Sequence, residues 1–189
     1  MLSPNSTTGG GLQSSPLEGL DLNRFFQQWF VSITGLEGQY VRPRWLAEPS
    51  NIPAAGVVWC ALGITRTIAD VYPYIEGGDL QRHEDISILS SFYDLGTNGM
   101  AQYYAALFRD GTAVPQNLEI LQLNGMGLIA VGEMTTVPSL LKERWLYRVD
   151  VPVSIRRVVQ RNYQVLTVES ADLGLNTGEG FKPIIVTEK

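Results

Sequence analysis

Residues 145–163 read WLYRVDVPVSIRRVVQRNY, and this stretch determines the fold class that we expect for the chain. Four β-branched residues recur in it at every second position: Val149, Val151, Val153 and Ile155. Strands place alternate side chains on opposite faces, so the run predicts one long strand with an apolar and a polar face. The alternation changes at Arg156 and Arg157, which we interpret as a β-bulge.

Other segments share this strand character. Residues 57–68 are rich in valine, isoleucine and threonine, and residues 82–93 place Ile86, Ile88 and Phe92 on one face. Residues 40–53 contain three prolines, which lack an N–H donor, so we expect an extended or edge segment there. Residues 127–132 and 164–171 predict two shorter strands, the second paired with the long strand.

The helical signal is strongest between Asp21 and Gly35. One stripe at helical spacing holds Leu22, Phe25, Phe26, Trp29, Phe30 and Ile33, which we interpret as core residues. Asp21 is a suitable N-cap, and Gly35 is a suitable residue to end the helix. A second helix is predicted over residues 99–110 with Thr97 or Asn98 as its cap, and a short third helix begins at Pro115.

This order of elements predicts an α+β fold with a mainly antiparallel β-sheet, long hairpins and helices packed on one face. The length of 189 residues suits one such domain, which we place at residues 20–175. Residues 1–19 are rich in serine, threonine and glycine and predict a flexible N-terminal arm. Residues 176–189 predict an extended C-terminal arm. Its apolar run lacks a local partner, so we expect it to add as a strand to another sheet edge.

The composition narrows the function classes. Charged residues make up 17% of the chain against about 25% in typical proteins, which indicates a surface partly covered by partners. The net charge of −5 argues against a protein that grips nucleic acid over its whole surface. One cysteine excludes an internal disulfide, and one histidine disfavours a zinc site. We expect a chain made in a reducing cytoplasm, with no signal peptide and no membrane span.

Several strings contain groups that could support catalysis. Glu84, Asp85 and Asp94 could form a carboxylate pair, but acids on the wet face of a strand are common. Ser139 and Lys142 match S-x-x-K without the companion motifs of that enzyme class. A small hydrolase or transferase therefore stays as an alternative, which requires these groups to converge in a pocket.

Three further features are better explained by structure than by chemistry. The string from Gly96 to Gly99 lacks the Gly-Lys-Ser/Thr end of a phosphate-binding loop, and a helix N-cap explains it. His83 has no nucleophile pattern nearby and is interpreted as a surface residue. Cys60 lies in an apolar strand and is interpreted as an inert core thiol. We predict that the chain is not an enzyme and holds no cofactor or metal.

Charge is distributed unevenly along the chain. Residues 142–161 hold six basic residues against two acids, a net charge of +4, whereas residues 69–94 hold one arginine against six acids, a net charge of −5. Such opposite fields suit head-to-tail association between copies, which closes into a ring when the rotation allows. The alternative is that the two segments pair within one chain as neighbours in the sheet.

Several short strings, taken in order, carry a resemblance to a known family. They are Arg42-Pro43-Arg44-Trp45, Glu48 to Pro53, Trp59 to Ile64, Tyr72-Pro73-Tyr74-Ile75, Arg82 to Tyr93, Arg109-Asp110-Gly111, Val114 to Asn117, Arg144 to Pro152 and Arg156-Arg157. In this order and spacing, over roughly residues 20–172, the chain resembles the neck or tail-terminator proteins of tailed bacteriophages.

The resemblance implies a structural protein of the virion. It implies a subunit of a hexameric ring that caps the head-proximal end of the tail tube and joins the tail to the head connector. The implied partners are the tail tube protein, the connector or adaptor and, in contractile tails, the sheath. DNA would pass through the channel without sequence-specific binding. The chain could instead be a head-completion or tail-tube protein of the same virion, or a host-derived peptide-binding module.

The residues expected at interfaces follow from the basic segment and the apolar tail. They are Arg144, Arg148, Arg156, Arg157, Arg161, Phe181, Ile184 and Ile185. The arginines could meet an acidic partner surface, and the tail could latch a neighbour through main-chain hydrogen bonds.

Overall fold

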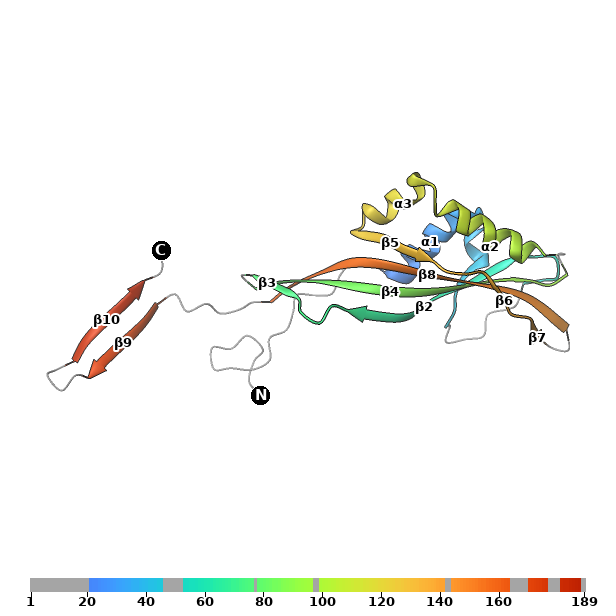
Figure 1. Cartoon of the computed structure of the whole chain (residues 1–189). Helices are drawn as coiled ribbons and strands as arrows, with labels where there is room; N and C mark the ends of the chain where they lie inside the picture. Colours follow the sequence, from blue (N-terminus) through green and yellow to red (C-terminus); the bar gives the residue numbers. More distant parts are fainter. Residues whose placement is uncertain are drawn as a thin grey trace. The chain divides into compact units, whose positions relative to one another are not determined.

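A computed structural model describes residues 21–45, 53–76, 78–96, 99–141, 144–163, 170–176 and 181–187. Its elements run in chain order as α1 (Leu22–Thr34), η1 (Gly38–Tyr40), β1 (Val41–Pro43), β2 (Trp59–Ala69), β3 (Tyr74–Glu76), β4 (Asp79–Asp94), α2 (Met100–Gly111), α3 (Pro115–Gln122), β5 (Met126–Val131), β6 (Thr135–Thr136), β7 (Ser139–Leu141), β8 (Arg144–Asn162), β9 (Ser170–Asn176) and β10 (Phe181–Thr187). This is the predicted α+β fold, with α1, α2 and α3 on one face of the sheet (Figure 1).

The described residues fall into two compact units. The larger unit holds residues 21–74 and 81–160, and the smaller unit holds residues 75–80 and those from 161 onward. The domain boundaries expected at residues 19 and 175 stay a prediction, because residues 1–20, 164–169 and 177–180 lie outside the described part of the chain.

The main sheet has the strand order β1-β2-β4-β8-β5, with β3 beside β4 and with β6 and β7 beside β8. Strands β2 and β4 are antiparallel, from Trp59 opposite Tyr93 to Ala69 opposite Glu84. Strands β5, β6 and β7 all pair antiparallel with β8. The three-residue strand β1 is parallel to β2, so the sheet is mixed but mostly antiparallel.

Helix α1 forms as its sequence predicts. The Asp21 carboxylate accepts hydrogen bonds from the backbone N–H groups of Asn23 and Arg24 at 3.1 and 3.2 Å. Gly35 ends the helix in the left-handed conformation, with φ of 69°, where a side chain would be strained. The buried stripe of α1 holds Phe26, Trp29, Phe30 and Thr34.

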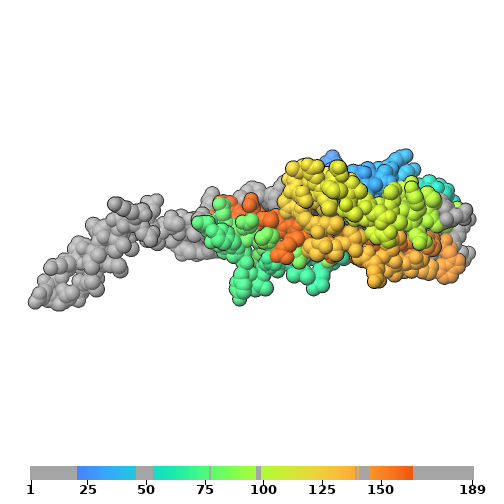
Figure 2. Space-filling view, turned by 45° about the horizontal axis from the view of Figure 1, so that its top comes forward, coloured from blue at the N-terminus to red at the C-terminus, as the bar shows by residue number. Residues whose placement is uncertain are grey.

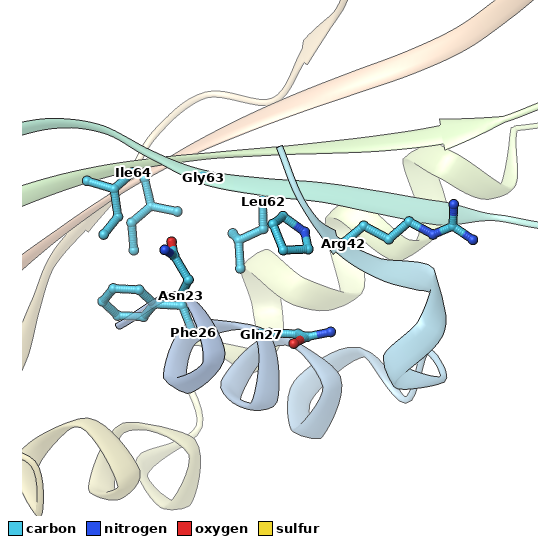
Figure 3. Close-up of a pocket in the computed structure, with 9 residues that line it drawn as sticks. Asn23, Phe26, Gln27, Arg42, Leu62, Gly63 and Ile64 are labelled. Atoms are coloured by element: carbon cyan, nitrogen blue, oxygen red, sulfur yellow. The ribbon is translucent and has the colours of Figure 1, made fainter. Parts of the chain in front are cut away.

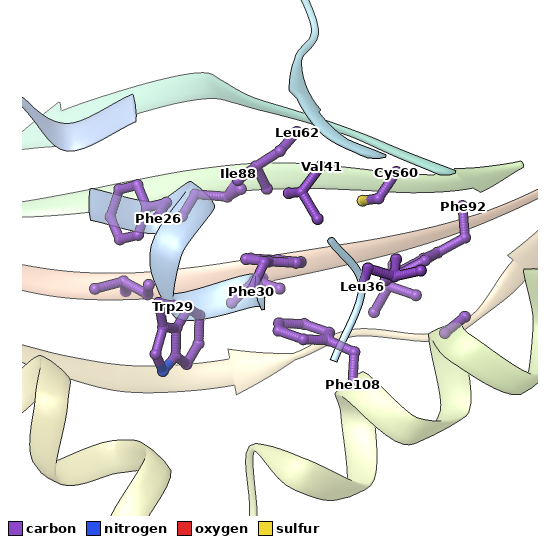
Figure 4. Packing of buried hydrophobic residues seen from close by; sticks show 14 of the residues in the cluster. Phe26, Trp29, Phe30, Leu36, Val41, Cys60, Leu62, Ile88, Phe92 and Phe108 are labelled. Atoms are coloured by element: carbon purple, nitrogen blue, oxygen red, sulfur yellow. The ribbon is translucent and has the colours of Figure 1, made fainter. Parts of the chain in front are cut away.

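The core lies between the helices and the sheet face that carries alternate residues of β4 and β8 (Figure 4). The rings of Phe30 and Phe108 stack with centroids 3.9 Å apart, and Trp29 meets Phe108 edge-on at 5.6 Å. The Trp29 indole N–H donates to the Asn117 carbonyl at 2.8 Å, so its polar atom is satisfied inside the core. The core therefore ties α1, α2 and α3 to one another.

Helix α2 is capped differently from the prediction. Its N-cap residue is Gly99 and not Thr97 or Asn98, which lie outside the described residues. Gly99 has no side chain, but the buried Asp94 carboxylate accepts a hydrogen bond from the Ala101 N–H at 3.1 Å. A negative group at the first turn is stabilising because it meets the positive end of the helix dipole.

The predicted bulge at Arg156 and Arg157 is wrong. Strand β8 keeps its register there, with Met126 opposite Arg157 and Gly127 opposite Arg156. The irregularity lies in β5, between Leu128 and Ala130. The apolar pattern breaks because Arg157 occupies the inward position between Ile155 and Val159, where it forms an ion pair with Glu84.

On the outer side of strand β1, backbone groups are already engaged by a side chain of α1. The Gln27 side-chain amide donates to the carbonyls of Val41 and Gly38 at 2.7 and 2.9 Å. Pro43 has no N–H to offer, and the next N–H, that of Arg44, donates inward to the Leu62 carbonyl at 2.7 Å. A further strand would find few free backbone groups along this edge.

The C-terminal strands form a hairpin of their own. Strand β10 pairs antiparallel with β9, from Phe181 opposite Asn176 to Thr187 opposite Ser170. The prediction that this tail has no local partner is therefore wrong. The strand predicted over residues 164–171 falls mostly outside the described residues.

Candidate interaction surfaces

The sheet face opposite the helices carries a chain of polar side chains that runs from the end of β1, across β2, to β4 and β8. Arg44, just after β1, donates to the Ser91 hydroxyl on β4, and Ser91 donates to the Asp150 carboxylate on β8. Arg148 closes the chain with two hydrogen bonds to Asp150, at 2.7 and 2.5 Å. This network links strands that are far apart in sequence and fixes their side chains in one arrangement.

Interactions within this network shift the pKa values of Asp150 and Arg148. Burial opposes ionisation of Asp150, but the hydrogen bonds from Arg148 and Ser91 outweigh it and lower the pKa of this carboxyl. The hydrogen bond to Asp150 likewise raises the pKa of Arg148. Both groups therefore hold their charges firmly, as in a structural ion pair.

Aromatic rings border this network. Trp59 on β2 stacks on Tyr93 on β4 with centroids 4.1 Å apart, and the Arg148 guanidinium lies 5.9 Å from the Tyr93 ring centre. The Trp45 ring lies so close to Gly63 that a Cβ added there would come within 2.6 Å of it. Gly63 is therefore required by close packing on this face.

The acidic and basic segments meet within one chain at Arg156 and Arg157. Arg156 lies 2.8 Å from Asp70 and 3.3 Å from Asp85, with about half of each side chain exposed. Arg157 and Glu84 pair at 2.8 Å and are 13% and 14% exposed. These two arginines thus form their ion pairs within one chain and not between copies.

The remaining residues expected at interfaces are dispersed. Arg144 begins β8, and Arg161 lies half-buried near the end of that strand. Phe181, Ile184 and Ile185 lie in β10, of which only the backbone is described. The arginines are spread along the length of β8, and among the described residues no compact basic patch unites them.

The carboxylates considered for catalysis have separate structural roles. Asp85 pairs with Arg156, Glu84 with Arg157, and Asp94 caps α2. Asp85 and Asp94 lie on opposite faces of β4 and about 30 Å apart along the strand. Ser139 begins β7, and Lys142 lies outside the described residues.

His83 and Cys60 also take the places expected of them. His83 is exposed, 3.8 Å from the Asp70 carboxylate. Cys60 is fully buried, and burial raises the pKa of its thiol, so it is unreactive. Within the described residues no three potential metal ligands gather, and none of the described helices has the length and apolar character to cross a membrane.

Among the described residues of the larger unit, two hollows stand out. The first lies between α1 and the start of β1 (Figure 3), and its cavity volume of about 10 Å³ is no more than one water molecule fills. Arg42 extends away from it, and Gln27 points toward β1. The second, which we call the end groove, is an open recess with a cavity volume of about 310 Å³ lined by Gly35, Leu36, Glu37, Tyr40, Gly56, Val57, Val58, Met100 and Tyr104.

Exposed apolar side chains gather at the two ends of the β2–β4 strand pair. At one end is the connection after β2, which we call the hairpin tip (residues 68–74); Val71 is 79% and Tyr72 90% exposed. Figure 2 shows this green segment projecting from the unit. At the other end lie Met100 and Tyr103 of α2 and the cross-strand pair Leu140 and Trp145, the latter 71% exposed.

Sequence reasoning did not single out these ends. The signal was present, since Val71, Tyr72 and Tyr74 form an apolar run between polar Asp70 and the glycines at 77 and 78. Large exposed apolar patches mark interaction sites. These ends are therefore candidate surfaces for docking to other chains.

The family follows from comparison with known proteins. The model of the phage neck terminator protein family matches residues 20–180, so the chain belongs to this family. Membership makes it a structural protein of the phage neck and tail, and it points to a role without catalysis. A comparison with curated proteins found no match.

Proposed function

We propose that this chain is the tail-terminator subunit of the virion neck. In this role six copies form a ring that caps the head-proximal end of the tail tube, stops its growth and offers a surface to the head connector. Two observations support the proposal. The family model matches residues 20–180, and apolar side chains are exposed at both ends of the β2–β4 strand pair.

The open face of the sheet suits a position in or near a DNA channel. Arg148 and Arg156 on this face are engaged by carboxylates of the same chain. Cations that are already neutralised release few counterions from DNA, so duplex DNA would slide past without being held. The chain's partners would be other proteins: the tail tube, the connector and, in contractile tails, the sheath.

The predicted N-terminal arm, and the C-terminal segment that pairs within the β9–β10 hairpin, would act as latches in the assembled neck. Truncation of residues 1–19, or of residues 176–189, should abolish virion assembly while the larger unit still folds. Circular dichroism would check folding, and electron microscopy would count complete particles. Normal particles from both truncations would contradict the latch.

Phage propagated without this chain tests the function itself. We expect tails of irregular length and heads without tails, both restored when the full chain is supplied. Quantitative mass spectrometry of purified virions should find six copies per particle. A tail-tube protein would instead be present in many stacked rings. Joined tails of uniform length in its absence would refute the proposal.

A further inference from the structure

The two apolar ends of the larger unit differ in shape. The hairpin tip is a projection with Val71, Tyr72 and Tyr74 exposed, whereas the end groove is a recess that includes Leu36, Val57, Val58 and Met100. Both belong to the same unit and to the same strand pair, β2 and β4. Their relative position is therefore set by the sheet.

The strand register places tip and groove at opposite ends. Val57 and Val58 immediately precede β2, whereas Val71 and Tyr72 follow its last residue, Ala69. Ten residue steps separate Trp59 from Ala69, and an extended strand of this length spans about 33 Å. A projection and a recess at opposite ends of one body cannot meet within a chain, but they can meet between copies.

We propose that the hairpin tip of one copy docks into the end groove of the next copy, which makes the head-to-tail contact of the ring. This inference rests on the proposed function and names the surfaces that would carry it. The contact is heterologous, since two different surfaces of the chain meet, and such contacts generate rings when the rotation closes.

The chemistry of the two surfaces fits. Tyr72 at the tip offers an O–H donor on an apolar ring, and the groove combines apolar side chains with polar groups that include the Glu37 carboxylate, which only accepts. The cavity volume of about 310 Å³ lies at the lower end of the roughly 300–1,000 Å³ typical of sites that enclose a small molecule, which leaves room for an aromatic side chain of the tip. Tyrosine is also among the residues that dominate interface energetics.

The small buried area of this contact agrees with copies that associate stably only when the ring forms. Each buried aromatic side chain covers about 150–250 Å², so the tip removes some hundreds of Å² per partner. A stable pairwise interface buries about 800 Å² per partner. Two free copies should thus associate weakly, while a closed ring gains from having every contact made at once.

Thiol cross-linking of virions tests this contact. Phage is complemented with the full chain carrying both Tyr72→Cys and Met100→Cys, and particles are treated with a short bismaleimide. The native Cys60 is buried and should not react. We expect a ladder of covalent multimers that ends at the size of the ring. The matched control, Tyr72→Cys with Leu123→Cys, uses a residue that is 80% exposed but lies at the end of α3, and it should give no ladder.

The outcomes separate the two proposals. Virions that contain the chain but show no ladder would overturn the docking and leave the terminator function intact. Dimers from Tyr72→Cys alone, or a ladder with Leu123→Cys, would overturn it too, because the tip would then lie elsewhere. Virions that never contain the wild-type chain would overturn the proposed function itself. As a second readout, Tyr72→Ala should weaken self-association in solution about tenfold or more, and Leu123→Ala should leave it unchanged.

Discussion

Different interactions stabilise the two faces of the main sheet. The helix-covered face holds a close-packed core of Trp29, Phe30 and Phe108. The opposite face is held by hydrogen bonds and ion pairs among side chains such as Arg44, Ser91 and Asp150. The helix-covered face therefore supplies most of the stability. The opposite face sets the charge and shape of the surface, and its contributions to stability are smaller and depend on pH.

The largest expected effect is in the core. Phe108→Ala removes a ring that contacts both Trp29 and Phe30, and should lower the free energy of unfolding by about 3–5 kcal/mol. Urea denaturation followed by tryptophan fluorescence would measure it. Tyr103→Ala, on the exposed side of the same helix, is the control and should change little. Equal losses of stability from the two substitutions would contradict the dominant contribution of the buried core.

The next effect is at the ion pair that lies inward on the helix side. Arg157→Met leaves the Glu84 carboxylate without its cation in a site where both side chains are nearly covered. We expect a loss of about 3 kcal/mol, because an unpaired buried charge is costly. If Glu84→Gln added to Arg157→Met restored stability, the cost would be that of the stranded charge. No loss in the single variant would contradict the burial of this pair.

A smaller effect is expected at the centre of the open face. Asp150→Asn should cost about 1–3 kcal/mol at neutral pH, because Arg148 and Ser91 lose a charged acceptor. Since the folded pKa of Asp150 is lowered, its contribution is complete above the unfolded value of about 3.9 and is lost as pH falls through the folded pKa. The variant and wild type should therefore converge in stability in acid. A gap that stays constant with pH would disprove the role of the charge.

The smallest effect is expected at Arg156. Arg156→Met removes two ion pairs to half-exposed carboxylates, so the loss should stay below about 1 kcal/mol and shrink further in high salt. Thermal denaturation at low and high ionic strength would show this. A loss as large as that of Arg157→Met would mean that exposure does not decide the strength of these neighbouring pairs.

Local signals in the sequence predicted much of the fold. The α1 helix with its Asp21 cap and Gly35 end depends on residues a few positions apart, and it forms as expected. The alternation in β4 and β8 likewise depends on neighbours, so the two faces of the sheet could be assigned. The α+β class followed from the order of these elements.

Contacts between distant residues could not be read in the same way. Arg157 is 73 positions from Glu84, so its inward place looked like a break in the strand pattern. Asp94 looked like a free acid because its partner is the N–H of a helix that starts later. The groove likewise combines residues 35–40, 56–58 and 100–104, which only folding brings together.

The occupied β1 edge has a consequence for how copies meet before assembly. An open strand edge would let copies of the chain join into fibrils. Along β1, a glutamine amide and a proline ring close that route. Contacts between copies in this region are thus left to side-chain surfaces, which can be weak and reversible.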